Sequence, residues 1–180
     1  MTDRPQGLLA TPLQRVFAFG ADYIVIAVYA AFLTFLSFYI ADGEFKAPVA
    51  VTDKIAGHML GFATMTLPVV LYFSLLESGR AGASLGKRLL RVRVTQTNGA
   101  PLGLRKSLFR NLLKFAPWEI AHAAIWHVPG RPFLDPMPAA NLGFSIGALT
   151  IVILYILSLF IGGRTLYDRL AGTIVTRAAL

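Results

Sequence analysis

The chain has 180 residues, of which 56% are hydrophobic and only 14% are charged, and its mean hydropathy is +0.63. Ordinary soluble domains carry charge on about a quarter of their residues. This composition excludes a water-soluble globular domain and predicts an integral membrane protein. The chain contains no cysteine, which excludes disulfides, thiolate catalysis and cysteine-bound metals.

Four apolar segments are long enough to cross a bilayer, which takes about 20 residues of helix. We expect transmembrane helices over 16–41, 55–76, 108–128 and 141–163. The first run is too long for the apolar part of a cleaved signal peptide, so we expect it to stay attached. The third is the most polar, since it contains Arg110, Lys114, Glu119 and His122, and its basic end has to extend to the interface.

The charges outside the apolar cores indicate the orientation. With four spans, 14 of the 17 Lys and Arg lie at the N-terminus, in 78–114 or in the C-terminal tail. Basic residues favour the cytoplasmic side, so we expect both termini there. The net charge of +8 has its largest share beside the membrane, where anionic lipid head groups attract each basic residue by roughly 1 kcal/mol. We therefore expect lipid, and not nucleic acid, as the partner of this charge.

Two expected cytoplasmic segments resemble each other. Residues 84–95 align without gaps on residues 165–176, and each copy begins with a Ser or Thr, which cap helices well. We expect short amphipathic interfacial helices within 83–95 and 164–176, each with an extended tail. The alternative is that any helix leaving a membrane needs a basic amphipathic end. The basic residues expected at the lipid interface are Lys87, Arg88, Arg91, Arg93 and Arg169. The predicted fold is an all-α membrane protein with four transmembrane and two interfacial helices.

Asp22 is the one charge inside the first span. Burying a charge in lipid costs at least ~2.5 kcal/mol, so an intramembrane carboxylate needs a partner or a function. Arg15 lies two helical turns away, about 10 Å along the axis, which is too far for direct contact unless its side chain bends. Two interpretations remain open: an ion pair with another helix, and a site that binds a cation or a proton.

Glu119 and His122 are three residues apart and share one face of the third span. A glutamate and a histidine in hydrocarbon can exchange protons near neutral pH, so both are candidates for ion or proton binding. The same spacing occurs in di-iron bundles, but these need a second copy and further glutamates. The sequence has one copy, and we expect no metal.

Glycines occur in small-xxx-small spacing at Gly57 and Gly61 and at Gly143 and Gly147, which lets helices approach closely. Four helices are few for a transporter, so transport predicts a homo-oligomer. The chain has no complete phosphate-binding loop, no G-x-S-x-G turn and no zincin motif. We therefore expect neither an enzyme nor a bound cofactor.

Three residues carry a family resemblance. Arg15 opens the first span, Asp22 follows seven positions later, and Asp168 lies within the motif Arg-Thr-Leu-Tyr-Asp-Arg-Leu-Ala-Gly-Thr at 164–173. This pattern resembles the RDD family of small bacterial membrane proteins, and the resemblance covers nearly the whole chain as one domain, 1–180. It implies residence in the bacterial cytoplasmic membrane.

What the resemblance implies about function is divided, since some members look like sodium/proton antiporters and others are tied to regulating a membrane partner. We expect transport of a monovalent cation in exchange for protons, with Asp22 as the carboxylate. The alternative is a non-transporting scaffold or regulator that binds a partner protein or anionic lipid. Asp168 and Arg15 share the expected cytoplasmic side, where they can form a salt bridge. Such a bridge predicts that removing either residue destabilises the protein equally.

Overall fold

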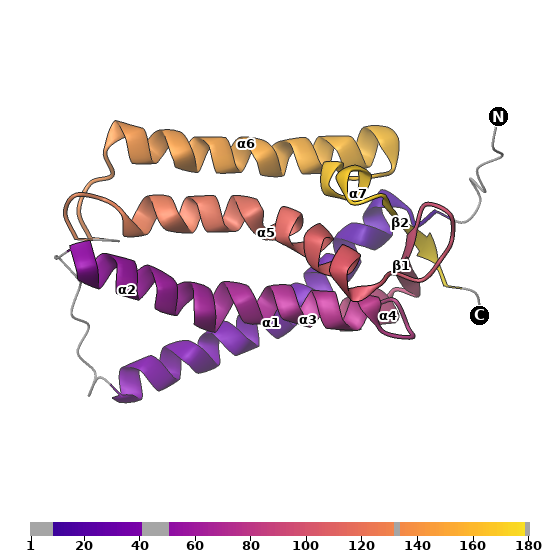
Figure 1. The fold of residues 1–180 in the computed structure, drawn as a ribbon, viewed down its shortest axis with the longest axis horizontal. Coiled ribbons are helices and arrows are strands. Elements are labelled where there is room, and N and C mark those ends of the chain that lie inside the picture. Colours follow the sequence, from indigo (N-terminus) through magenta and orange to yellow (C-terminus); the bar gives the residue numbers. More distant parts are fainter. Residues whose placement is uncertain (1–8, 41–50, 132–133, 179–180) are drawn as a thin grey trace. The chain divides into compact units, whose positions relative to one another are not determined.

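The computed structural model describes residues 9–40, 51–131 and 134–178, and the chain is mainly helical (Figure 1). The long elements in chain order are α1 (Pro12–Ile40), α2 (Val51–Gly61), a π-helical turn η2 (Phe62–Thr66), α3 (Leu67–Ser78), α5 (Leu104–Trp126) and α6 (Ala139–Gly162). The short elements are α4 (Leu85–Leu89), β1 (Val92–Gln96), α7 (Leu166–Leu170) and β2 (Thr173–Arg177).

Three helices are long and apolar enough to cross a membrane: α1, the continuous helix Thr52–Ser78 and α6. They confirm the first, second and fourth expected spans. The third expected span is also one helix, α5, but its charged residues make it less apolar than the other three helices. The chain is therefore a multi-pass membrane protein, and a fourth crossing by α5 stays a prediction.

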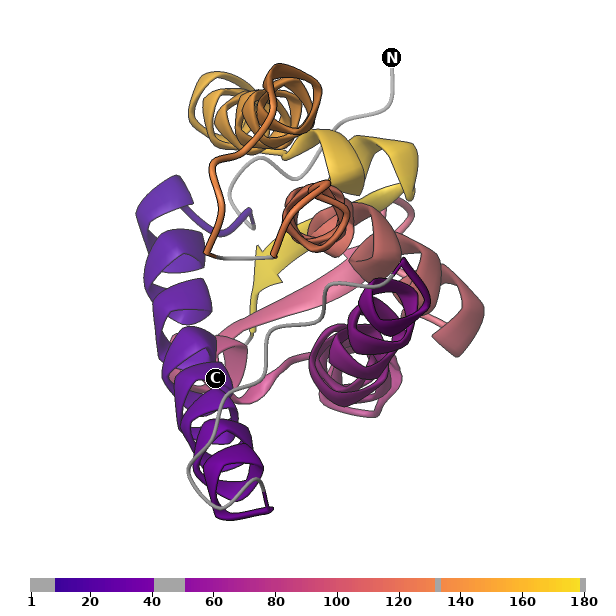
Figure 2. The ribbon, with the colours of Figure 1, turned by 90° about the vertical axis from the view of Figure 1, so that its left-hand side faces the viewer.

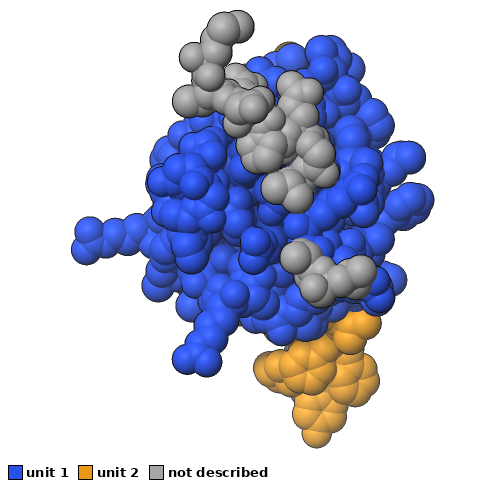
Figure 3. Space-filling model, turned by 90° about the vertical axis from the view of Figure 1, so that its right-hand side faces the viewer, with its two compact units in different colours: residues 1–25, 70–114, 153–180 blue, residues 26–69, 115–152 orange. Residues whose placement is uncertain are grey.

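The chain forms two compact units, each assembled from separate stretches of sequence (Figure 3). Unit 1 comprises residues 1–25, 70–114 and 153–180, and unit 2 comprises residues 26–69 and 115–152. Unit 1 therefore contains both short helices and both strands. Unit 2 contains α2, η2 and parts of the long helices.

Two prolines within the long helices leave carbonyl groups without their usual helical donor, because proline has no N–H. Pro68 frees the carbonyl of Thr64, and Pro117 frees that of Leu113. A tyrosine hydroxyl replaces the missing donor in each case: Tyr29 donates to the Thr64 oxygen at 2.6 Å and Tyr155 to the Leu113 oxygen at 2.8 Å. Each proline thus creates a position where a second helix attaches by a hydrogen bond.

The two similar segments form equivalent structures in unit 1, where α4, α7 and both strands lie together (Figure 1). Each begins with a capping residue, continues as a five-residue helix and ends in a five-residue strand. Arg91 and Gly172 are equivalent in this repeat, and both have a positive φ, 54° and 63°. The repeat is therefore a repeat of backbone structure and not only of basic amphipathic character.

The extended tails correct the all-α prediction, because β1 and β2 pair as an antiparallel two-stranded sheet. Val94 faces Val175, and these two valines are equivalent positions of the repeat. The pairing therefore relates the two segments by an approximate twofold rotation through this pair. Both valines are buried in an apolar cluster with Ala18 and Leu102, so the sheet is held by a hydrophobic core as well as by its ladder.

Gly86, at the start of α4, is where this substructure meets α1. A Cβ atom there would overlap the carbonyl oxygen of Ala18 and lie 2.8 Å from the backbone nitrogen of Asp22. Only glycine permits this approach, since backbone atoms cannot move aside as a flexible side chain can. Gly20 lies on α1 itself, and a Cβ atom added there would meet no described atom outside its own helix within 4 Å.

Replacing Gly86 with alanine is expected to destabilise the fold by about 1–3 kcal/mol, the usual range for overpacking. Gly20→Ala is the matched control, and we expect it to raise stability slightly because alanine favours helix. The measurement is the thermal unfolding midpoint of each purified variant in detergent. Equal midpoints for Gly86→Ala and Gly20→Ala would contradict the close contact between α4 and α1.

Candidate functional site

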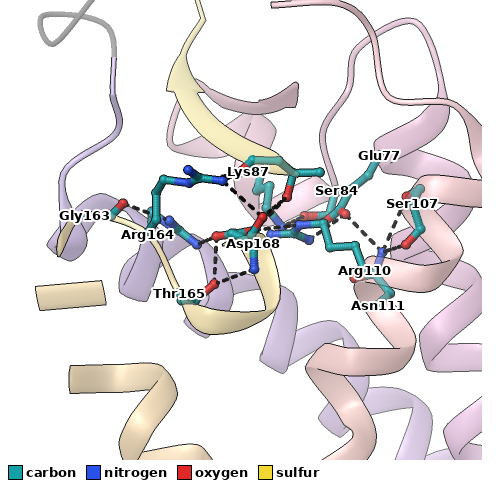
Figure 4. A network of polar contacts seen from close by, with 12 residues as sticks. Glu77, Ser84, Lys87, Ser107, Arg110, Asn111, Gly163, Arg164, Thr165 and Asp168 are labelled. Atoms are coloured by element: carbon teal, nitrogen blue, oxygen red, sulfur yellow. Dashed lines mark hydrogen bonds and ion pairs between the residues drawn. The ribbon is translucent and has the colours of Figure 1, made fainter. Parts of the chain in front are cut away.

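A chain of buried charges of alternating sign runs through unit 1 (Figure 4). Its centre is Arg110 on α5, whose side chain is 1% exposed. Arg110 donates from Nε to Oδ1 of Asp168 and from Nη1 to Oε2 of Glu77, both at 2.8 Å. Lys87 continues the chain by donating to Oε1 of Glu77 at 2.8 Å, and Arg15 pairs with Oδ2 of Asp168. The network therefore connects α1, α3, α4, α5 and α7.

Asp168 is fully buried, with two cationic partners and two hydroxyl donors, of which Thr173 donates to Oδ1 at 3.1 Å. Thr165, the cap of α7, donates to its Oδ2 at 2.8 Å. Burial by itself raises the pKa of the Asp168 carboxyl, but the charges of Arg110 and Arg15 outweigh it and hold that pKa below its ordinary value. The carboxylate is ionised at neutral pH. The expected bridge from Arg15 to Asp168 is confirmed, and the sequence missed Arg110 as its second arginine.

Asp22 is also fully buried, but its partners are neutral. It accepts from the hydroxyls of Tyr72 at 2.8 Å and Ser84 at 2.5 Å, and from the backbone N–H of Gly86 at 2.8 Å. The Gly86 N–H belongs to the first turn of α4, which has no helical acceptor for it. Asp22 therefore caps α4 from another helix. The hydrogen-bond partners of Asp22 are neutral groups, so the structure does not show the interhelical ion pair that was one of the two interpretations.

A second polar cluster lies in unit 2, where α2 and α5 run side by side (Figures 1 and 2). Glu119 on α5 accepts from Thr66 at 2.7 Å through Oε2, and its Oε1 lies 2.8 Å from Nε2 of His58 on α2. On the other side of the His58 ring, Nδ1 lies 3.1 Å from Nε2 of His127. Thr66 is the last residue of η2, and π-helical turns occur frequently at functional sites.

His122 completes the cluster from the turn of α5 that follows Glu119. Its Nε2 accepts from the indole N–H of Trp126 at 2.7 Å, and its Nδ1 lies 3.8 Å from Oε2 of Glu119. That distance is too long for a hydrogen bond. Among the residues that the structure describes, the buried Nδ1 of His122 has no hydrogen-bond partner.

His58, Glu119 and His122 are grouped closely enough to hold a metal ion, with one ligand atom from each within 4.8 Å of the others. The expectation that no metal site exists rested on the single Glu-x-x-His copy. The structure supplies the third residue from α2, 61 positions before Glu119. A histidine between two glycines was visible in the sequence, but only the packing of α2 on α5 brings it to Glu119.

The residues expected at the lipid interface divide into two groups. Arg88, Arg91, Arg93 and Arg169 are exposed. Lys87 differs, because it is 8% exposed and pairs with Glu77 inside unit 1. Arg88, Arg91 and Arg93 line a cavity of about 400 Å³ beside the first strand.

Comparison with known proteins gives one family. The model of the RDD family matches residues 9–172, which is nearly the whole chain. No curated protein and no solved structure gives a significant match.

Asp168→Asn is expected to destabilise the protein more than Arg15→Ala, contrary to the equal effects that a simple pair predicts. The amide removes the negative charge from between two arginines, and breaking a buried pair typically costs about 3–5 kcal/mol. After Arg15→Ala, Asp168 still has Arg110. The measurement is again the unfolding midpoint in detergent.

The matched control for this pair of variants is Asp135→Asn, whose ion pair with Arg131 lies at the surface. An exposed pair contributes little, so the midpoint should not change measurably. Equal destabilisation by Asp168→Asn and Arg15→Ala would mean that Arg110 does not hold Asp168 as described.

Proposed function

Because the chain belongs to the RDD family, we propose that this multi-pass membrane protein carries a cation across the bacterial cytoplasmic membrane through the polar cluster of unit 2. The observation that supports this most is the surroundings of Glu119. Its described hydrogen-bond and ion-pair partners are two histidines and a threonine, with no lysine or arginine among them. A carboxylate among apolar helices without a fixed cationic partner attracts a mobile cation.

The other buried carboxylates are less suited to that role. Glu77 and Asp168 already have cationic partners on both oxygens. Asp22, our first candidate, accepts three hydrogen bonds and caps α4. A cation at any of these positions would have to displace a structural contact. Glu119 is the more accessible group, with a quarter of its side chain exposed.

Lys54 supports the same assignment. It is buried one turn before His58, but its ammonium donates to the carbonyl oxygens of Val128 and Pro129, at 2.7 and 3.0 Å. Its charge is thereby directed to the end of α5 and not to Glu119. The carboxylate stays available to a transported ion.

For the membrane topology, we propose that the chain crosses the bilayer four times, with both termini in the cytoplasm. The 23 residues of α5 extend about 34 Å at 1.5 Å per residue, which is enough to cross the hydrocarbon core. Four helices per chain favour a homo-oligomer. Gly143 and Gly147 on α6 have open space within 4 Å of the position of a Cβ, and so leave room for another helix.

A second candidate function is a scaffold that docks anionic lipid. The cavity beside the first strand, with Arg88, Arg91 and Arg93 in its wall, supports this candidate. Arginine pairs well with phosphate oxygens. The buried network of unit 1 would then serve only to hold this surface in shape.

Proteoliposomes distinguish the two functions. We expect the purified protein to move an added cation, and a dye that reports internal pH to show whether protons move in exchange for sodium, potassium or lithium. Glu119→Gln should lower the flux at least tenfold at equal amounts of folded protein. Asp53→Asn, an exposed carboxylate change on α2, should transport as the wild type does.

Asp22→Asn separates capping from transport in the same assay. We expect a lower yield of folded protein, and near-normal flux from the fraction that folds. Full flux from Glu119→Gln, or no flux of any cation from folded wild type, would overturn the transport proposal and favour the scaffold.

A further inference from the structure

We propose that His58, Glu119 and His122 form a binding site for a divalent transition-metal ion such as Zn²⁺ or Co²⁺. This site is the polar cluster of unit 2. That the metal is also the transported ion rests on the proposed function. The family resemblance implied a monovalent cation. The ligand chemistry of the cluster points to a different class.

The donor set is the first argument. Sodium and potassium are bound mainly by oxygen atoms, whereas imidazole nitrogens suit zinc, cobalt, nickel and iron. The cluster offers two imidazoles and one carboxylate. Two histidines with one glutamate form an open type of zinc site, in which a fourth position stays available to water or another ligand.

The spacing is the second argument. Bonds of about 2.0–2.1 Å in tetrahedral geometry put neighbouring ligand atoms about 3.4 Å apart. Oε1 of Glu119 lies 2.8 Å from Nε2 of His58, and Oε2 lies 3.8 Å from Nδ1 of His122. The two distances start from different oxygens of Glu119, and one ligand atom from each of the three residues lies within 4.8 Å of the others. Rotation of the side chains therefore has to bring these three atoms closer together to surround an ion.

The surroundings of the ligands are the third argument, since metal ligands are normally oriented by further hydrogen bonds. Thr66 donates to the Glu119 carboxylate, and His127 lies at the nitrogen of His58 that faces away from Glu119. When a metal takes Nε2 of His58, the ring proton moves to Nδ1 and is donated to His127. Each of these two ligands thus has a partner that fixes its orientation.

Glycine packing fixes the third ligand. A Cβ on Gly61 would lie 2.9 Å from Cε1 of His122, and one on Gly57 would lie 2.6 Å from Cη2 of Trp126. The two glycines on either side of His58 therefore let α5 approach until His122 and His58 meet, with ring centres 5.4 Å apart. The small-xxx-small motif in α2 acts here within one chain.

Trp126 supplies a signal for metal binding. Its indole donates to Nε2 of His122, so the neutral ring carries its proton on Nδ1. A metal at Nδ1 requires that proton to move to Nε2, and Trp126 must then give up its bond. Trp118 stacks on the same ring at 6.3 Å, and the chain has only these two tryptophans. All intrinsic tryptophan fluorescence therefore arises beside His122.

The test uses the full chain in detergent, with any affinity tag removed, titrated with Co²⁺ and then with competing Zn²⁺. We expect one Co²⁺ per chain, a visible absorption band typical of nitrogen and oxygen ligands, and quenching of tryptophan fluorescence that Zn²⁺ reverses. His122→Gln and His58→Gln should each weaken binding at least tenfold, and Asp53→Asn should bind as the wild type does. Both histidine variants are used so that one that fails to fold leaves the other as a test.

The outcomes separate this inference from the proposed function. Metal binding in detergent without Zn²⁺ flux in proteoliposomes would support the site and refute transport of the metal. Sodium or potassium flux that depends on Glu119, without Co²⁺ binding, would support transport and overturn the metal site. Binding that is unchanged in folded His122→Gln and His58→Gln would also overturn it.

Discussion

Arg110 holds unit 1 together, because one guanidinium joins two carboxylates on helices that are far apart in sequence. Glu77 lies in the last turn of α3 and Asp168 lies in α7, and each is fully buried with Arg110 between them. An unpaired charge at any of these positions would cost several kcal/mol. Each carboxylate has a second cationic partner on its other oxygen: Lys87 pairs with Glu77, and Arg15 pairs with Asp168. The network therefore specifies where α4 and α7 attach to the long helices, and with them the sheet.

Each copy of the repeat contributes one charged residue to this network. Lys87 and Asp168 are equivalent positions of the two similar segments, and they carry opposite charge. Asp168 pairs with Arg110 directly, and Lys87 is linked to Arg110 through Glu77. The backbone therefore follows an approximate twofold relation, while the charge at the equivalent position has the opposite sign. Unit 2 is chemically different. The ionisable side chains around Glu119 are histidines, and in the described part of this cluster no arginine pairs with the carboxylate.

Much of the fold followed from periodicity and composition. The apolar runs predicted three helices that the structure confirms as long enough to span, and the alignment of 84–95 with 165–176 anticipated the two helix–strand segments. The pairing of the tails was missed because each is short and follows a helix. Arg110 was interpreted as a basic residue that extends to the interface, since sequence spacing gives no sign that it faces Asp168, 58 residues later. Gly57 and Gly61 predicted close helix packing, but no sequence spacing places His58, which lies between them, beside Glu119, 61 residues later.

Fixed ion pairs shape unit 1, and we propose that the histidine–glutamate cluster of unit 2 binds the cation. X-ray absorption at the zinc edge, on protein loaded with one Zn²⁺ per chain, tests this most directly. We expect nitrogen and oxygen neighbours at about 2.0–2.1 Å with the outer scattering of two imidazoles, reduced to one by His122→Gln. A shell of oxygen atoms alone, or a spectrum unchanged by that substitution, would contradict it.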